Sequence, residues 1–149
     1  GDYQCPYCAE AYPVVAALVQ RYGDALAIAF RNFPLTEAHP EAYSAAVVAE
    51  FAGQHGQFWA AHDALYENQA WLGPDLYARI TQSLGLDVAA LQRAIDSGSF
   101  DARIRRDMNS GLRSGVNGTP CFFFDGERLD VQGDFRALNE VGAQFLPGT

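Results

Sequence analysis

Apolar residues recur along much of the chain at the three- and four-residue intervals of amphipathic helices. Residues 5–22 carry such a stripe, and Pro13 within it is expected to bend the helix. Residues 41–114 continue the pattern almost without interruption, with glycines at its breaks. This stretch predicts five consecutive helices, at residues 41–52, 57–66, 75–84, 88–97 and 101–114.

Two other stretches favour β-structure. In residues 25–33, large apolar side chains alternate with small ones, as they do in a strand. Residues 121–125 and 128–131 flank the dipeptide Asp125-Gly126, which is a strong hairpin signal. The chain therefore combines a strand and a hairpin with many helices.

Capping residues mark several of the predicted helix starts. Asp87 and Ser99 stand before two of the helices and fit as N-caps. Asp134 opens a last helix that should run to about Phe145. The expected order is helix, strand, five helices, hairpin and helix, which is an α/β arrangement.

Length and charge narrow the class of protein. A chain of 149 residues can form one domain with a real core, and 49% of its residues are hydrophobic. Acidic residues outnumber basic ones 18 to 10, which gives a net charge of −8. Nucleic acids and anionic membranes attract clustered positive charge, so neither is an expected partner. No apolar run reaches the roughly 18 residues that span a bilayer, so no membrane insertion is expected.

The candidate chemistry begins with Cys5-Pro6-Tyr7-Cys8 at the start of the first predicted helix. Unpaired N–H groups and the positive end of the helix dipole favour negative charge there. Cys5 is therefore expected to have a lowered pKa and to act as the attacking thiolate. Cys8, one turn further on and more covered, is placed to resolve a mixed disulfide. Pro6 is tolerated at a helix start because its missing N–H would be unpaired anyway.

A structural disulfide, a zinc site and an iron–sulfur cluster are alternatives for this cysteine pair. A structural zinc site usually needs four ligands. The chain offers only one further sulfur, that of Cys121, and its three histidines show no ligand spacing around it. Neither a metal nor a cofactor is therefore expected. The histidines are expected on the surface or in helix packing, and none of them is expected to be catalytic: His39, His55 and His62.

A second motif lies near the other end of the chain, where Gly118-Thr119-Pro120 leads into the apolar residues 121–124. Proline removes a backbone donor and is awkward at a strand start. A cis bond between Thr119 and Pro120 would suit a tight turn there, although a strand can also simply begin with proline. The backbone N–H and C=O of Thr119 would then be free to pair with a substrate peptide.

Together the two motifs resemble the DsbA-like branch of the thioredoxin superfamily. The resemblance covers nearly the whole chain. The matching residues are Asp2-Tyr3-Gln4-Cys5-Pro6-Tyr7-Cys8, Pro13, Gly118-Thr119-Pro120, Phe122-Phe123 and Asp125-Gly126. It implies an α/β thioredoxin-like fold with an all-helical insertion. Residues 1–33 and 116–149 would form the core and residues 41–114 the insertion, in one structural unit.

The resemblance also implies a thiol–disulfide oxidoreductase that acts on protein or peptide thiols and disulfides and is recycled by a redox partner. Its catalytic residues would be Cys5 and Cys8, with Pro6 and Tyr7 tuning the thiol pKa. DsbA has a histidine at the position of Tyr7, and tyrosine cannot carry its positive charge. The substrate strip would be Gly118, Thr119 and Pro120. No cofactor is needed, because the electrons reside in the cysteine pair.

Cys121 departs from the family, which usually has a small hydroxyl or apolar residue after the proline. It is expected to be a buried small hydrophobe. The alternative is a third thiol near the site. The whole domain has a further alternative reading, as a redox switch or binding module of a larger protein. The bacterial periplasm or cell exterior is slightly favoured over the cytoplasm.

The family fold contains one strand more than this sequence predicts. That strand comes directly before Cys5 and, in the family's topology, lies between the segments that correspond to residues 25–33 and 121–124. Only Gly1 to Gln4 precede Cys5, too few residues to cross a sheet, and the chain looks trimmed. Unpaired backbone groups on both sides would be costly. We therefore expect the gap to be filled by residues absent from this chain or by a strand of another chain.

Overall fold

The computed structural model describes residues 1–131 and 133–147. Residues 132 and 148–149, which belong to the predicted core range 116–149, lie outside the described residues. Along the described residues the elements are α1 (Pro6–Tyr22), η1 (Gly23–Ala25), α2 (Ala42–Gln54), α3 (Phe58–Glu67), η2 (Gln69–Trp71), α4 (Pro74–Ser83), α5 (Val88–Ser97), α6 (Asp101–Arg113), β1 (Phe123–Phe124), β2 (Glu127–Arg128) and α7 (Arg136–Phe145).

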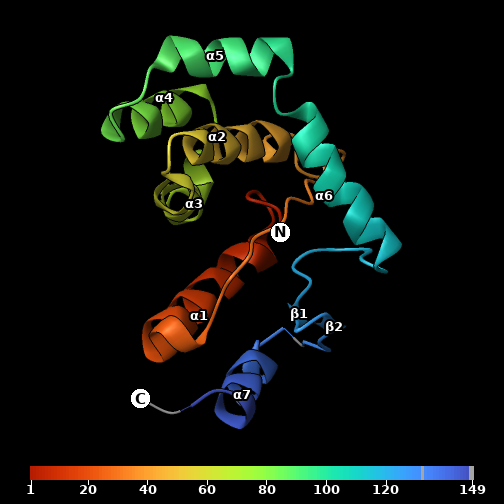
Figure 1. Ribbon diagram of the computed structural model, residues 1–149. Helices are drawn as coiled ribbons and strands as arrows, with labels where there is room; N and C mark the ends of the chain where they lie inside the picture. Colours follow the sequence, from red (N-terminus) through yellow and green to blue (C-terminus); the bar gives the residue numbers. More distant parts are fainter. Residues whose placement is uncertain (132, 148–149) are drawn as a thin grey trace.

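The elements form two groups that meet near the N-terminus (Figure 1). Helices α2 to α5 gather on one side of Gly1, while α1, the β1–β2 hairpin and α7 lie on the other. Helix α6 runs from the first group towards the hairpin. The five helices predicted between residues 41 and 114 are confirmed. Their largest shift is at the end of α2, which reaches residue 54 instead of 52.

Of the three residues predicted to cap a helix, one is confirmed as an N-cap. The Asp87 carboxylate accepts a bond of 2.9 Å from the backbone N–H two residues on and caps α5, as predicted. The predicted Ser99 cap of α6 is wrong. Phe100 is the N-cap, and the Ser99 hydroxyl pairs with a neighbouring serine instead. Asp134 was predicted to cap α7, but the N-cap is Phe135. Asp134 lies one residue earlier and accepts from Arg136 N–H at 3.1 Å, which satisfies one free donor at the start of the helix.

Two hydrophobic clusters hold these elements together. The larger one joins the turn before α1 to α2–α5 and contains Tyr3, Cys5 and Cys8. The smaller one packs α1 against α7. This second contact needs a glycine, because a Cβ on Gly142 would lie only 2.8 Å from the Tyr22 ring. Both cysteines of the Cys-x-x-Cys motif are thus part of the main core.

The predicted hairpin is confirmed. β1 and β2 are antiparallel, with Phe123 opposite Arg128 and Phe124 opposite Glu127. Asp125 and Gly126 both have positive φ, at 48° and 85°, as a two-residue turn of this type requires. The strands are only two residues long, shorter than predicted. Among the described residues β1 is paired on one side only, which limits the ladder.

Residues 25–33 do not form the predicted regular strand. The reason is that they have almost no strand beside them. Among the described residues only Gly1 pairs with this segment as a strand would: its amino group donates to Arg31 O at 2.6 Å, and its carbonyl accepts from Phe33 N–H at 2.8 Å. In parallel strands, one residue bonds to the two residues that flank the position opposite it on the neighbouring strand. Gly1 is therefore in the register of a strand parallel to residues 25–33.

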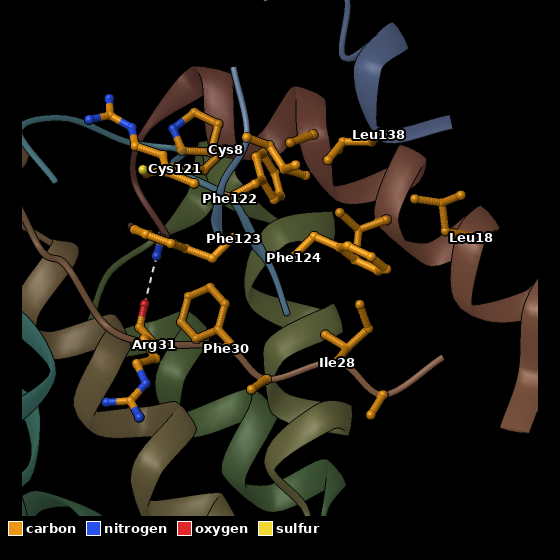
Figure 2. A pocket seen from close by; sticks show the side chains of 18 of the residues that line it. Cys8, Leu18, Ile28, Phe30, Arg31, Cys121, Phe122, Phe123, Phe124 and Leu138 are labelled. Atoms are coloured by element: carbon orange, nitrogen blue, oxygen red, sulfur yellow. Dashed lines mark hydrogen bonds between the residues drawn. The ribbon is translucent and has the colours of Figure 1, made fainter. Parts of the chain in front are cut away.

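Beyond Gly1, a slot of about 1230 Å³ separates residues 25–33 from residues 120–126 (Figure 2). Helices α1 and α7 contribute to its walls. Apolar side chains from all four segments line it, among them Leu18, Ile28, Phe30, Phe122, Phe124 and Leu138. The two segments are not paired with each other, and the described residues contain only the two-stranded sheet. The described residues thus lack the first core strand, as predicted, and what fills its place stays a prediction.

Candidate active site

Cys5 and Cys8 stand at the beginning of α1. Cys5 is the N-cap, with extended backbone angles, and Pro6 occupies the first helical position. Both cysteines are free thiols. Cys8 was expected to be the more covered of the two, but this is wrong: each is only 3% exposed. The turn before the helix packs into the main core and buries Cys5 as deeply as its partner.

The structure brings the two predicted motifs together. The Cys5 thiol donates to the carbonyl oxygen of Thr119, with Sγ 3.6 Å from the oxygen. The bond between Thr119 and Pro120 is cis. Cys8, Thr119, Pro120 and Cys121 all line the slot. Residues 114 positions apart in the sequence therefore share one site.

The remaining predicted site residues lie around this contact. Pro6 is exposed, and the Tyr7 side chain is 61% exposed, so both face solvent beside the buried cysteines. Cys121 is half-buried rather than enclosed. Gly118 has open space where a side chain would lie.

A buried carboxylate fixes the turn that carries Cys5. The Asp2 side chain is fully buried and lies 2.7 Å from His39 Nδ1. It also accepts from Gln4 N–H at 2.8 Å and from Leu35 N–H at 3.0 Å. The Asp2 carbonyl accepts from Cys5 N–H at 3.2 Å. Asp2 thus ties the turn to the loop that follows residue 33.

The helical layer holds the same turn from the other side. The Gln69 side-chain amide donates to the carbonyls of Tyr3 and Cys5, both at 2.9 Å. The Gln4 side chain accepts from Glu41 N–H at 2.7 Å. The active-site turn therefore depends on the insertion for its shape.

Two of the residues that position this turn, His39 and Gln69, were not predicted from the sequence. His39 was placed on the surface or in helix packing, and Gln69 was not singled out. Neither belongs to a motif, and the partners of Gln69 lie 64 and 66 residues away. Asp2 was the one positioning residue that the sequence could suggest, because it lies just before the cysteine motif.

His62 packs inside the helical layer. Its Nδ1 lies 2.9 Å from the Tyr3 hydroxyl, and several aromatic rings surround it. Burial lowers the pKa of His62 to about 4. The imidazole is thus neutral at physiological pH and acts as a hydrogen-bonded core residue.

The Cys8 thiol lies in a setting that opposes ionisation. Burial raises its pKa to about 11, although the backbone N–H of Asp2 and the Thr119 hydroxyl act against the rise. Cys8 is therefore a neutral thiol near pH 7. No three metal-ligating side chains gather in the part of the chain that the structure describes. The residues present do not make up the four ligands of a structural zinc site.

Comparison with known proteins agrees with the fold. A family model described as Thioredoxin matches residues 1–141. The chain therefore belongs to the thioredoxin family. It also superposes on the crystal structure of oxidised BdbD from Bacillus subtilis with a TM-score of 0.75 and 18% sequence identity, over 95% of this chain and 81% of that one. Family and fold together confirm the thioredoxin-like fold that the motifs predicted.

The curated relatives are much longer proteins. The Na(+)/H(+) antiporter NhaA 1 of Salinispora arenicola is 34% identical over 149 residues, which are 100% of this chain and 23% of that protein. The antiporter NhaA of Herminiimonas arsenicoxydans is 34% identical over 148 residues, 99% of this chain and 23% of its own length. The chain thus spans under a quarter of either relative. No described helix is long and apolar enough to cross a bilayer.

The raised pKa of Cys8 predicts its reactivity. In a variant with Cys5→Ser and Cys121→Ser, Cys8 is the remaining thiol, and only its thiolate reacts with iodoacetamide. We expect the alkylation rate to follow a pKa of about 11. At pH 8 the rate should be about a thousandth of its plateau, since each pH unit below the pKa lowers the thiolate fraction about tenfold. The same variant unfolded in urea is the control and should titrate near 8.5. A folded-state pKa close to that of the control would contradict the prediction.

Proposed function

We propose that this protein exchanges disulfides with protein or peptide thiols through Cys5-Pro6-Tyr7-Cys8, by way of a mixed disulfide on Cys5. One observation supports this most: Cys5 Sγ lies 3.6 Å from the Thr119 carbonyl. A substrate strand that paired with the backbone at Thr119 and Pro120 would place its own sulfur beside Cys5. Pairing through the backbone reads no particular side chain, so the enzyme would accept many substrates.

Each direction of the exchange balances without a cofactor. In reduction, the Cys5 thiolate attacks a substrate disulfide, and the first substrate sulfur leaves as a thiolate. Cys8, once deprotonated, attacks Cys5 Sγ, forms the Cys5–Cys8 disulfide and releases the second substrate sulfur. The substrate gains two electrons, and the cysteine pair loses them. Substrate oxidation is the reverse. A separate redox partner would return the pair to its starting state.

The roles of the neighbouring residues follow from their exposure. Pro6 fixes the first turn of α1, and Tyr7 presents an uncharged ring at the surface beside Cys5. Gly118 lets a substrate backbone approach the strip closely. Cys121 lines the slot and is half-buried, so it is proposed as a packing residue outside the exchange cycle.

A second candidate function is a redox-switch or binding module of a larger protein. The relatives that are named antiporters favour it, because this chain matches only about 23% of their length. Dithiol–disulfide exchange at Cys5 and Cys8 would also be the chemistry of such a module. We propose a bacterial compartment outside the cytoplasm for either function, since disulfides persist there.

The exchange activity gives the first test. The chain should catalyse the reduction of insulin by dithiothreitol, and Cys5→Ser should abolish the rate above background, because no attacking sulfur remains. Cys121→Ala is the matched control and should keep nearly full activity. Equal activity in wild type and Cys5→Ser would contradict the proposal, as would loss of activity in Cys121→Ala alone.

We also propose that a β-strand occupies the slot, and that it is formed by residues joined directly to the amino group of Gly1. Gly1 already bonds to Arg31 and Phe33 in parallel register, so a chain extended from it would run along residues 25–30. The slot is apolar and, at about 1230 Å³, larger than the roughly 300–1,000 Å³ of small-molecule sites. A strand would also supply partners for backbone groups on both walls.

A chain with residues added before Gly1 tests whether a strand occupies the slot. About six apolar, β-branched residues are added before Gly1, and a matched variant carries a Gly-Ser-Pro extension of equal length. Only the apolar extension should slow amide exchange in residues 26–30 and 122–124, by about a hundredfold or more, and raise the melting temperature. Equal exchange in the two variants would contradict the proposal. Protection in the unextended chain together with a dimer would show that a second copy supplies the strand instead.

A further inference from the structure

We infer that the backbone carbonyl of Thr119 is a substrate-binding group whose availability depends on the redox state of Cys5. The reduced protein occupies this carbonyl with its own thiol, and the oxidised protein leaves it free for a backbone N–H of the substrate. The inference rests on the proposed function and deepens it, because it predicts which redox form binds a substrate peptide more tightly.

The contact between Cys5 and Thr119 is the main support. The Cys5 thiol donates to the Thr119 carbonyl oxygen, with Sγ 3.6 Å from that oxygen. Among the hydrogen bonds of the described residues, no other donor reaches this oxygen. Thr119 and Pro120 are only half-buried, so a peptide from solvent can reach them. The thiol therefore bonds to the same acceptor that a substrate strand would use.

Thr119 also has a second polar group that the rest of the chain does not satisfy. Its hydroxyl oxygen is buried and has no hydrogen-bond partner among the described residues. Such groups are costly and rare in folded proteins. The carbonyl of the same residue is paired only with a thiol, which is a weak donor. Poor pairing within the chain is what we expect of a residue that binds a ligand.

The backbone of Cys5 is held from several sides. Its N–H donates to the Asp2 carbonyl at 3.2 Å, and its own carbonyl accepts from the Gln69 side chain at 2.9 Å. The Asp2 carbonyl also accepts from the Tyr66 hydroxyl at 3.3 Å. Cys5 is buried in the main core. Its backbone therefore keeps its place beside Thr119 when the sulfur changes its chemical state.

Oxidation of the cysteine pair removes the donor. When the pair reduces a substrate disulfide, a bond forms between the sulfurs of Cys5 and Cys8, and the bond between the substrate sulfurs breaks. The two electrons and the two thiol protons of the pair pass to the substrate, which leaves as two thiols. A disulfide sulfur carries no hydrogen, so Cys5 can no longer donate to Thr119. An unpaired carbonyl gains more from a new N–H donor than a paired one does.

This change would help the exchange in one direction. The oxidised protein is the form that accepts thiol substrates, and it would present the free Thr119 carbonyl to them. Once the exchange has reduced the pair, the Cys5 thiol would bond to the carbonyl again and favour release of the oxidised product. Affinity and chemistry would thus change together, in the direction that oxidation of substrates needs.

The test uses a peptide that binds without reacting, namely an extended peptide of about six residues in which serine replaces cysteine. Its dissociation constant is measured by calorimetry with the full chain, oxidised or reduced, at about pH 5, where thiols are protonated. The oxidised protein should bind about threefold or more tightly, since one neutral hydrogen bond is worth about that much. Equal affinities, tighter binding to the reduced protein or no measurable binding to the oxidised protein would overturn the inference.

Two substitutions separate the hydrogen bond from other effects of oxidation. Cys5→Ser keeps a donor beside Thr119 and should bind the peptide like the reduced protein, while Cys5→Ala has no donor and should bind like the oxidised protein. The matched control is the same pair of substitutions at Cys8, because no hydrogen bond of the described residues joins Cys8 to the Thr119 carbonyl. Cys8→Ser and Cys8→Ala should bind alike.

Equal affinities of folded Cys5→Ser and Cys5→Ala would overturn the inference, while insulin reduction by wild type would still support the proposed function. If one of these variants does not fold, the comparison of oxidised with reduced wild type still decides the question.

Discussion

The structure of the site depends on a buried negative charge at Asp2. A carboxylate inside a protein is tolerated only where it is paired and hydrogen-bonded. Asp2 meets this requirement with His39 and with two backbone N–H groups, one in its own turn and one in the loop after residue 33. Moving the turn would leave the charge without partners. The turn that ends in Cys5 is therefore held in one conformation before any substrate arrives.

The helical layer and the thioredoxin-like elements are linked by polar contacts as much as by packing. Gln69 donates to the carbonyl of Cys5 itself. Asp107 of α6, which is also buried and lines the slot, accepts from Asn32 N–H at 3.0 Å and pairs with Arg103 at 2.6 Å. These bonds hold the end of segment 25–33 in place, although the segment forms no β-ladder with another described strand. The domain boundaries proposed at residues 33 and 41 therefore separate parts that share their hydrogen bonds.

The sequence was most informative where structure is local. The helices follow their apolar spacing closely, and Asp125-Gly126 forms the predicted turn because it needs only its own backbone angles. Segment 25–33 shows the limit of such patterns. It alternates like a strand, but a strand requires a neighbouring strand, and in the part of the chain that the structure describes only Gly1 pairs with it.

The two cysteines and Pro120 were also visible in the sequence, because they belong to short motifs. The residues that surround them were not. His39, Tyr66 and Gln69 reach the site through one or two side-chain bonds each, to residues 37 to 66 positions away. Such bonds leave no periodic signal, and any of several polar residues would look equally suitable in the sequence. These residues join the site only in the folded protein, where the helical insertion packs against the turn that carries Cys5.

Trapping the intermediate tests the central claim, that Cys5 is the sulfur that exchanges with substrate. In a Cys8→Ser variant the mixed disulfide cannot be resolved from within the protein, so it should accumulate. Mixed with a disulfide-containing peptide, this variant should form one covalent adduct per chain, located by mass spectrometry at Cys5 and released by dithiothreitol. An adduct at Cys121, or no adduct at all in a folded variant, would contradict the claim.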